Sequence, residues 1–119
     1  MLVGKGALGM VLDDYLELEL IRGLRNIFED NIQKIILYGS AARKENTAES
    51  DIDIAIILKH RIDPEKREEF LVWSAELDMK YETVISIIDI EEDKIMQWGE
   101  VLPFYRNLQN EGIVLWKIA

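Results

Sequence analysis

Four residues in two short segments have the side chains and the spacing needed to hold a metal–nucleotide complex. Gly39 and Ser40 end one apolar run, and Asp51 and Asp53 begin another one after a gap of ten residues. Side chains alternate between the two faces of a strand, so Asp51 and Asp53 share a face and can bind one metal ion together. Gly39 lets the backbone approach a phosphate, and Ser40 adds a hydroxyl and exposed N–H donors. The pattern predicts a metal–nucleotide site.

Nucleotidyl transfer is the chemistry that such a site would support. A hydroxyl must attack the α-phosphorus of a nucleoside triphosphate in line, and the charge that spreads over the phosphate oxygens needs divalent cations. Asp51 and Asp53 are therefore the candidate catalytic residues and the candidate ligands of Mg²⁺, while Gly39 and Ser40 are the candidate nucleotide-binding residues. The alternative is a charge pair at a strand end, but two like charges on one face repel and require a cation nearby.

The remaining sequence predicts the elements that must position these residues. Hydrophobic spacing and capping residues predict helices over residues 14–28, 64–81, 92–98 and 103–110, and strands over residues 34–38, 51–58, 83–90 and 113–117. This order predicts an α+β, or mixed α/β, domain in which helices pack mainly on one face of a small mixed sheet. In the second strand the aliphatic face must meet the helices, so the carboxylate face is expected to be open.

Composition limits the functional classes. The 119 residues predict one domain over residues 13–119, preceded by a loose segment over residues 1–12 in which Met10 could be the natural start. That segment is too short to span a membrane and has no signal-peptide features. The formal charge of −9 argues against free binding of nucleic acid, and the absence of cysteine suits a cytoplasmic protein. The single histidine, His60, is expected to be a solvated surface residue.

The Gly39-Ser40 turn, the ten-residue gap and the run Ser50-Asp51-Ile52-Asp53 resemble the signature of the polymerase-β-type nucleotidyltransferase superfamily. The short chain resembles its minimal nucleotidyltransferase branch, whose members are often paired with a HEPN-type protein. This resemblance implies a nucleotidyltransferase fold, a two-metal Mg²⁺ site, and transfer of a nucleoside monophosphate, AMP from ATP, to a hydroxyl. It also implies that Arg43 steadies the triphosphate, although a structural salt bridge is the competing interpretation of Arg43.

The resemblance departs from the family pattern at the third carboxylate. The family places this acid on the strand that follows the long helix, and Ser86 occupies the matching position here. Asp89 and Glu82 are the candidate substitutes for the third metal ligand. Strand alternation turns Asp89 to the face opposite Ser86, whereas Glu82 shares the parity of Ser86 but lies nearer the start of the strand.

Two functions follow from these features. The first is an antitoxin enzyme that transfers AMP to a HEPN-type ribonuclease. The second is a catalytically degenerate nucleotidyltransferase that neutralises its partner by contact, with Ser86 as the sign that the chemistry was lost. Apolar strands without edge protection also suggest a homodimer. An aminoglycoside-modifying enzyme ranks lower, because such enzymes need an additional helical domain.

Overall fold

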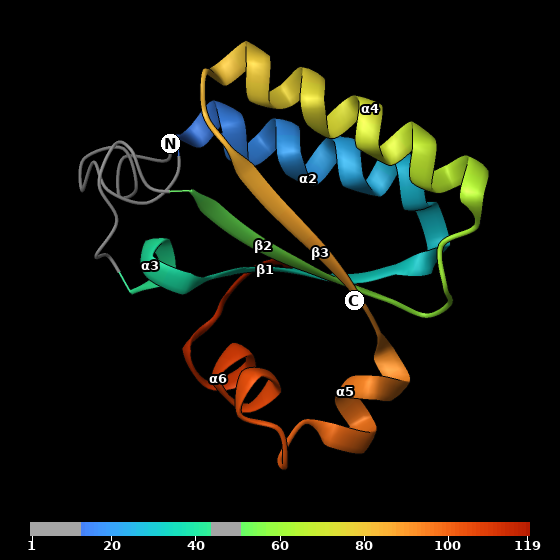
Figure 1. Ribbon diagram of the computed structural model, residues 1–119, viewed down its shortest axis with the longest axis vertical. Coiled ribbons are helices and arrows are strands. Elements are labelled where there is room, and N and C mark those ends of the chain that lie inside the picture. Colours follow the sequence, from blue (N-terminus) through green and yellow to red (C-terminus); the bar gives the residue numbers. More distant parts are fainter. Residues whose placement is uncertain (1–12, 44–50) are drawn as a thin grey trace.

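Four strands form a single mixed sheet in the order β3-β2-β1-β4 (Figure 1). The computed structural model describes residues 13–43 and 51–119 of the chain. β1 is antiparallel to both β2 and β4, and β2 is parallel to β3. The strands are β1, Ile32–Tyr38; β2, Ile52–Leu58; β3, Ile85–Glu91; and β4, Ile113–Lys117. The predicted strands are confirmed, with β1 starting two residues earlier and β3 two residues later than expected.

The two long helices, α2 (Asp14–Phe28) and α4 (Pro64–Tyr81), cover one face of this sheet (Figure 1). Asp13 caps α2 by accepting a hydrogen bond from the backbone N–H of Tyr15 at 2.8 Å. Asp63 caps α4 in the same way, and Pro64 takes the first helical position, where its missing N–H costs nothing. The face of β2 that carries only aliphatic side chains is buried beneath these helices. A short 3₁₀ turn, Glu29–Asn31, leads from α2 into β1.

Two shorter helices, α5 (Glu92–Trp98) and α6 (Pro103–Glu111), lie against the other face of the sheet (Figure 1). Leu108 of α6 forms a second buried cluster with Ala55 and Ile57 of β2. The predicted fold class is confirmed, but the expectation of an open carboxylate face is wrong for this half of β2. The reason is that the row that begins with the aspartates continues with apolar residues, which also need cover.

The predicted loose segment, residues 1–12, lies outside the described residues. In the described part of the chain, none of the helices is both long enough and apolar enough to cross a membrane.

Candidate functional site

The Asp53 carboxylate lies beside Gly39, in the space that a side chain at that position would fill. β1 ends at Tyr38, which lies opposite Asp53 in the antiparallel register of β1 and β2. The chain then enters α3, a single helical turn over Gly39–Ala42, with Gly39 at a φ of 72°. A Cβ at Gly39 would lie 2.5 Å from Oδ2 of Asp53. The two halves of the sequence pattern therefore meet at one corner of the sheet, and only glycine fits there.

Gly39→Ala is expected to separate the two halves of this corner. The added methyl group overlaps the Asp53 carboxylate, and the positive φ adds about 1–2 kcal/mol of backbone strain. If this corner holds Mg²⁺–ATP, the affinity should fall at least about tenfold, because about 1.4 kcal/mol already changes a binding constant tenfold. Isothermal titration would measure the affinity, and thermal unfolding would report whether the fold survives. An unchanged affinity would show that the carboxylate does not need its contact with the turn.

Negative charge accumulates at this corner. Burial raises the pKa of the Asp53 carboxyl above its usual range, and the nearby charge of Asp51 raises it further. Burial also raises the pKa of the Tyr38 hydroxyl, with a contribution from Asp53. The exposed Asp51 precedes β2 at its open end. A bound cation would neutralise the charge that disfavours ionised Asp53.

The elevated pKa of Asp53 predicts a pH-dependent cost to stability. A carboxyl whose folded pKa is raised stabilises the fold most below its unfolded pKa, and this contribution is lost as the pH rises through the folded pKa. Without metal, Asp53→Asn should therefore raise the melting temperature at pH 7 and have little effect near pH 3. If Asp53 binds Mg²⁺, the order should reverse when Mg²⁺ is added, because asparagine does not supply a charged ligand. Thermal unfolding at both pH values, with and without Mg²⁺, would measure both effects. Glu100→Gln, which removes the same charge from an exposed side chain, is the control. A lower melting temperature for Asp53→Asn than for the wild type at pH 7 without metal would contradict this prediction.

Ser86 occupies the position next to Asp53 on β3. The parallel register pairs Asp53 with Ser86, so both side chains leave the same face of the sheet. The same register pairs Asp89 with Ile56, whose side chain faces the long helices. There the Asp89 carboxylate accepts a hydrogen bond from Nη2 of Arg67 on α4 at 3.2 Å, and the two side chains form an ion pair. Asp89 is therefore turned away from the aspartate pair.

Glu82 is also not brought to the aspartates. It caps the end of α4 in the left-handed conformation and is exposed, three residues before β3 begins, so strand alternation does not govern its side chain. Among the described residues no group of three or more acidic or histidine side chains is arranged to hold a metal ion. The structure thus joins Asp51 and Asp53 with Ser86 and with neither proposed substitute.

Ser40 and Arg43 belong to the turn that follows β1. Ser40 is half-buried in α3 beside Gly39. Arg43 ends the turn, and its Nη1 lies 3.8 Å from Oε1 of Glu111 at the end of α6. Arg43 therefore makes the salt bridge that was its competing interpretation, while about half of its side chain stays exposed beside the corner.

Two aromatic residues near the corner were missed in the sequence. The signal for Tyr38 is its place in the sequence: it directly precedes Gly39 at the end of β1, where the antiparallel register sets it opposite Asp53. Phe104 of α6 contacts the Tyr38 ring at a centroid distance of 5.7 Å. Phe104 lies far from the motif in the sequence, and only the packing of α6 beneath β1 brings it there.

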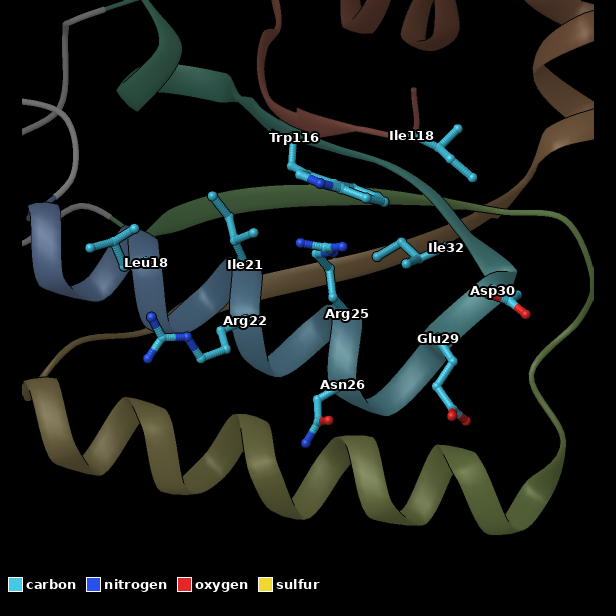
Figure 2. A pocket seen from close by; sticks show the side chains of 10 residues that line it. All are labelled: Leu18, Ile21, Arg22, Arg25, Asn26, Glu29, Asp30, Ile32, Trp116 and Ile118. Carbon is cyan, nitrogen blue, oxygen red and sulfur yellow. The ribbon is translucent and has the colours of Figure 1, made fainter.

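A separate groove of about 530 Å³ lies between α2 and β4 (Figure 2). Arg25 of α2 stacks over the Trp116 ring at 4.8 Å from its centroid. Arg22 and Glu29 line the outer side of the groove. Trp116 packs with the core beneath the long helices, whereas Asp53 faces the other side of the sheet. This groove is therefore distinct from the corner formed by Gly39 and Asp53.

Comparison with known proteins identifies the family of this chain. Residues 22–117 match the family described as polymerase beta, nucleotidyltransferase. A protein of Methanocaldococcus jannaschii, named "Putative protein adenylyltransferase", is 37% identical over 101 residues, which cover 82% of this chain and 92% of the relative. A second protein of that name from the same organism is 29% identical over 70 residues, covering 59% of this chain and 71% of the relative.

Solved structures share the fold at lower identity. A toxin–antitoxin crystal structure with AMP-PNP has a TM-score of 0.59 and 22% identity, covering 86% of this chain and 73% of that one. A tri-AMPylated Shewanella oneidensis HEPN toxin in complex with MNT antitoxin has a TM-score of 0.57 and 20% identity, covering 90% and 74%. The family match spans both strands of the motif and the sheet that aligns them. The chain therefore belongs to the polymerase beta nucleotidyltransferase family.

Proposed function

We propose that this protein is a Mg²⁺-dependent nucleotidyltransferase that moves AMP from ATP to a hydroxyl group of a HEPN-type ribonuclease and so acts as its antitoxin. One observation carries the proposal: the carboxylate of Asp53, next to Asp51, occupies the space that a side chain at Gly39 would fill. This brings a glycine turn suited to phosphate against two carboxylates suited to Mg²⁺. The name of the 37% identical relative supports adenylyl transfer to a protein.

The residues of the corner fit Mg²⁺. Asp51 and Asp53 would supply oxygen ligands, and a cation bound between them would offset the burial and the charge of Asp51 that together raise the pKa of Asp53. Bound Mg²⁺ would stabilise the charge of the triphosphate during displacement. Gly39 and Ser40 would contact the phosphates through the backbone and the hydroxyl. The half-exposed guanidinium of Arg43 would interact with the triphosphate while it stays near Glu111.

An exposed apolar surface supports a protein as the acceptor. The end of α5, the connection to α6 and the start of α6 expose several large apolar side chains: Met96, Trp98, Val101, Leu102 and Phe104. The Gln109 side chain donates a hydrogen bond to the Gly99 carbonyl at 3.1 Å, which fixes this connection. An ordered apolar surface of this kind is typical of a protein interface. The excess of acidic residues suits a basic partner such as a ribonuclease.

The second candidate is a binding module that neutralises the same partner without chemistry. Ser86 favours it, because the hydroxyl beside Asp53 cannot supply the charge of a third carboxylate. This module would use the same α5–α6 surface and would not require the aspartates. The two candidates therefore differ in whether neutralisation depends on Asp51 and Asp53.

Incubation of this protein with α-labelled ATP, Mg²⁺ and a HEPN-type ribonuclease from the same organism tests the proposal. The enzyme should place label on that protein, and EDTA should prevent it. Neutralisation of the ribonuclease without any label would favour the binding module.

We place the protein in the cytoplasm, where ATP and such a partner occur together. The homodimer stays a prediction for analytical ultracentrifugation.

A further inference from the structure

Phe104 belongs to a small aromatic cluster with Tyr38 and Tyr105. Its ring lies 5.7 Å from the Tyr38 ring at an interplanar angle of 87°, and 5.7 Å from the Tyr105 ring at 62°. Neither tyrosine lies parallel to Phe104, so neither is stacked face to face on it. Phe104 remains 43% exposed, although both tyrosines pack against the buried cluster beneath the sheet. The cluster therefore holds an accessible aromatic ring in a fixed orientation.

This ring lies on the same side of the sheet as the aspartates. Tyr38 is paired with Asp53, and residues directly opposite on antiparallel strands have Cα atoms about 5 Å apart. Tyr38 and Asp53 also interact electrostatically. In Figure 1, α6 lies beneath α3 at the end of the sheet where β1 gives way to Gly39. Tyr38 therefore lies between Phe104 and Asp53, on the side of the sheet that α6 covers.

We infer that Phe104 is the stacking surface for the nucleobase of the bound nucleotide. The inference rests on the proposed function, because it assumes that the triphosphate lies between Gly39 and the aspartates. The Tyr38 ring contacts Phe104, and Tyr38 lies opposite Asp53, so a base that extends from the phosphates toward α6 would meet Phe104. Every base has a π-face, so an aromatic ring binds it without reading its hydrogen-bonding edge. Phe104 thus favours a nucleotide over inorganic phosphates.

A docking surface for a partner protein is the competing role for Phe104, because the residue is continuous in sequence with exposed Val101 and Leu102. The contacts of Phe104 distinguish it from these neighbours. Its ring contacts Tyr38 and Tyr105, and Tyr38 is the residue opposite Asp53. The base-stacking role therefore predicts an effect on a free nucleotide, whereas the docking role predicts an effect on the partner alone.

Isothermal titration with Mg²⁺–ATP and with Mg²⁺–tripolyphosphate tests this inference. Alanine substitution of a base-stacking aromatic typically weakens binding by about 5- to 100-fold. We therefore expect Phe104→Ala to weaken ATP by that factor and to change tripolyphosphate by less than about twofold. Phe104→Trp should restore ATP binding, because it restores the π-face. Tyr15→Ala, which removes an exposed aromatic ring from α2 on the opposite side of the sheet, should leave both ligands unaffected.

The outcomes separate this inference from the proposed function. Unchanged ATP affinity in Phe104→Ala would overturn it, and so would an equal loss of ATP and tripolyphosphate, since the variant would then have disturbed the phosphate site. If the wild type bound neither ligand, the proposed function itself would fail. Circular dichroism melting of each variant establishes that the compared proteins are folded.

Discussion

Replacing Asp51 and Asp53 together by alanine should reduce AMP transfer by at least about 1000-fold. Metal ions contribute several kcal/mol to the stabilisation of a phosphoryl-transfer transition state, and each 1.4 kcal/mol is a factor of ten in rate. Asp53 lies on β2 beside the Gly39 turn, and Asp51 directly precedes that strand, so the double variant removes both candidate metal ligands of the corner. Single-turnover transfer of labelled AMP to the HEPN-type partner would measure the loss.

Asp89→Asn is the matched control for this variant. It also removes a strand carboxylate, but Asp89 faces α4 and pairs with Arg67 rather than with the corner. We expect normal transfer and a stability loss of no more than about 1 kcal/mol, because the ion pair is partly exposed. Transfer that survives in the double aspartate variant would refute the catalytic assignment. Neutralisation of the partner that survives without transfer would instead support the binding module.

Ser86→Asp should increase AMP transfer by about tenfold or more. Adjacent strands lie about 4.8 Å apart, so an aspartate at this position would stand beside Asp53 on the same face. It would add a third carboxylate to the corner and a base that can accept the proton of the attacking hydroxyl. Such positioned bases contribute about 100- to 10,000-fold, of which an engineered side chain recovers a part.

The same substitution should lower stability in the absence of metal. Three carboxylates would then share the corner in which Asp53 already has a raised pKa. Mg²⁺ should restore the melting temperature of Ser86→Asp, and it should have less effect on Ser86→Asn, the uncharged control of similar size. A transfer rate that does not rise, together with recovery by Mg²⁺, would mean that the added carboxylate binds metal without reaching the attacking hydroxyl.

The sequence predicted the fold through local patterns. Asp13 and Asp63 marked the starts of the two long helices, and the alternating aliphatic residues of β2 identified the face that these helices bury. The position of Ser86 also followed, because the family pattern placed it where a third carboxylate is expected, and in the structure it lies beside Asp53. These features depend on residues close together in the sequence or on a period that the sequence displays.

The cover on the second face of the sheet could not be predicted in the same way. It depends on where α6 crosses beneath β1, and no local pattern encodes that contact. Leu108 meets Ala55 and Ile57 there, and Phe104 meets Tyr38. Likewise the partner of Asp89 was hidden, because Arg67 lies 22 residues earlier, on α4. Long-range packing thus decided which candidate side chains reach the corner.

A crystal structure with Mn²⁺ in place of Mg²⁺ and a non-hydrolysable ATP analogue would test the central claim most directly. Anomalous scattering would locate the metal independently of the model used for phasing. We predict a metal bound by Asp51 and Asp53, with the triphosphate on the Gly39-Ser40 turn. Metal and nucleotide located elsewhere, for example in the groove between α2 and β4, would contradict the assignment of this corner as the nucleotidyl-transfer site.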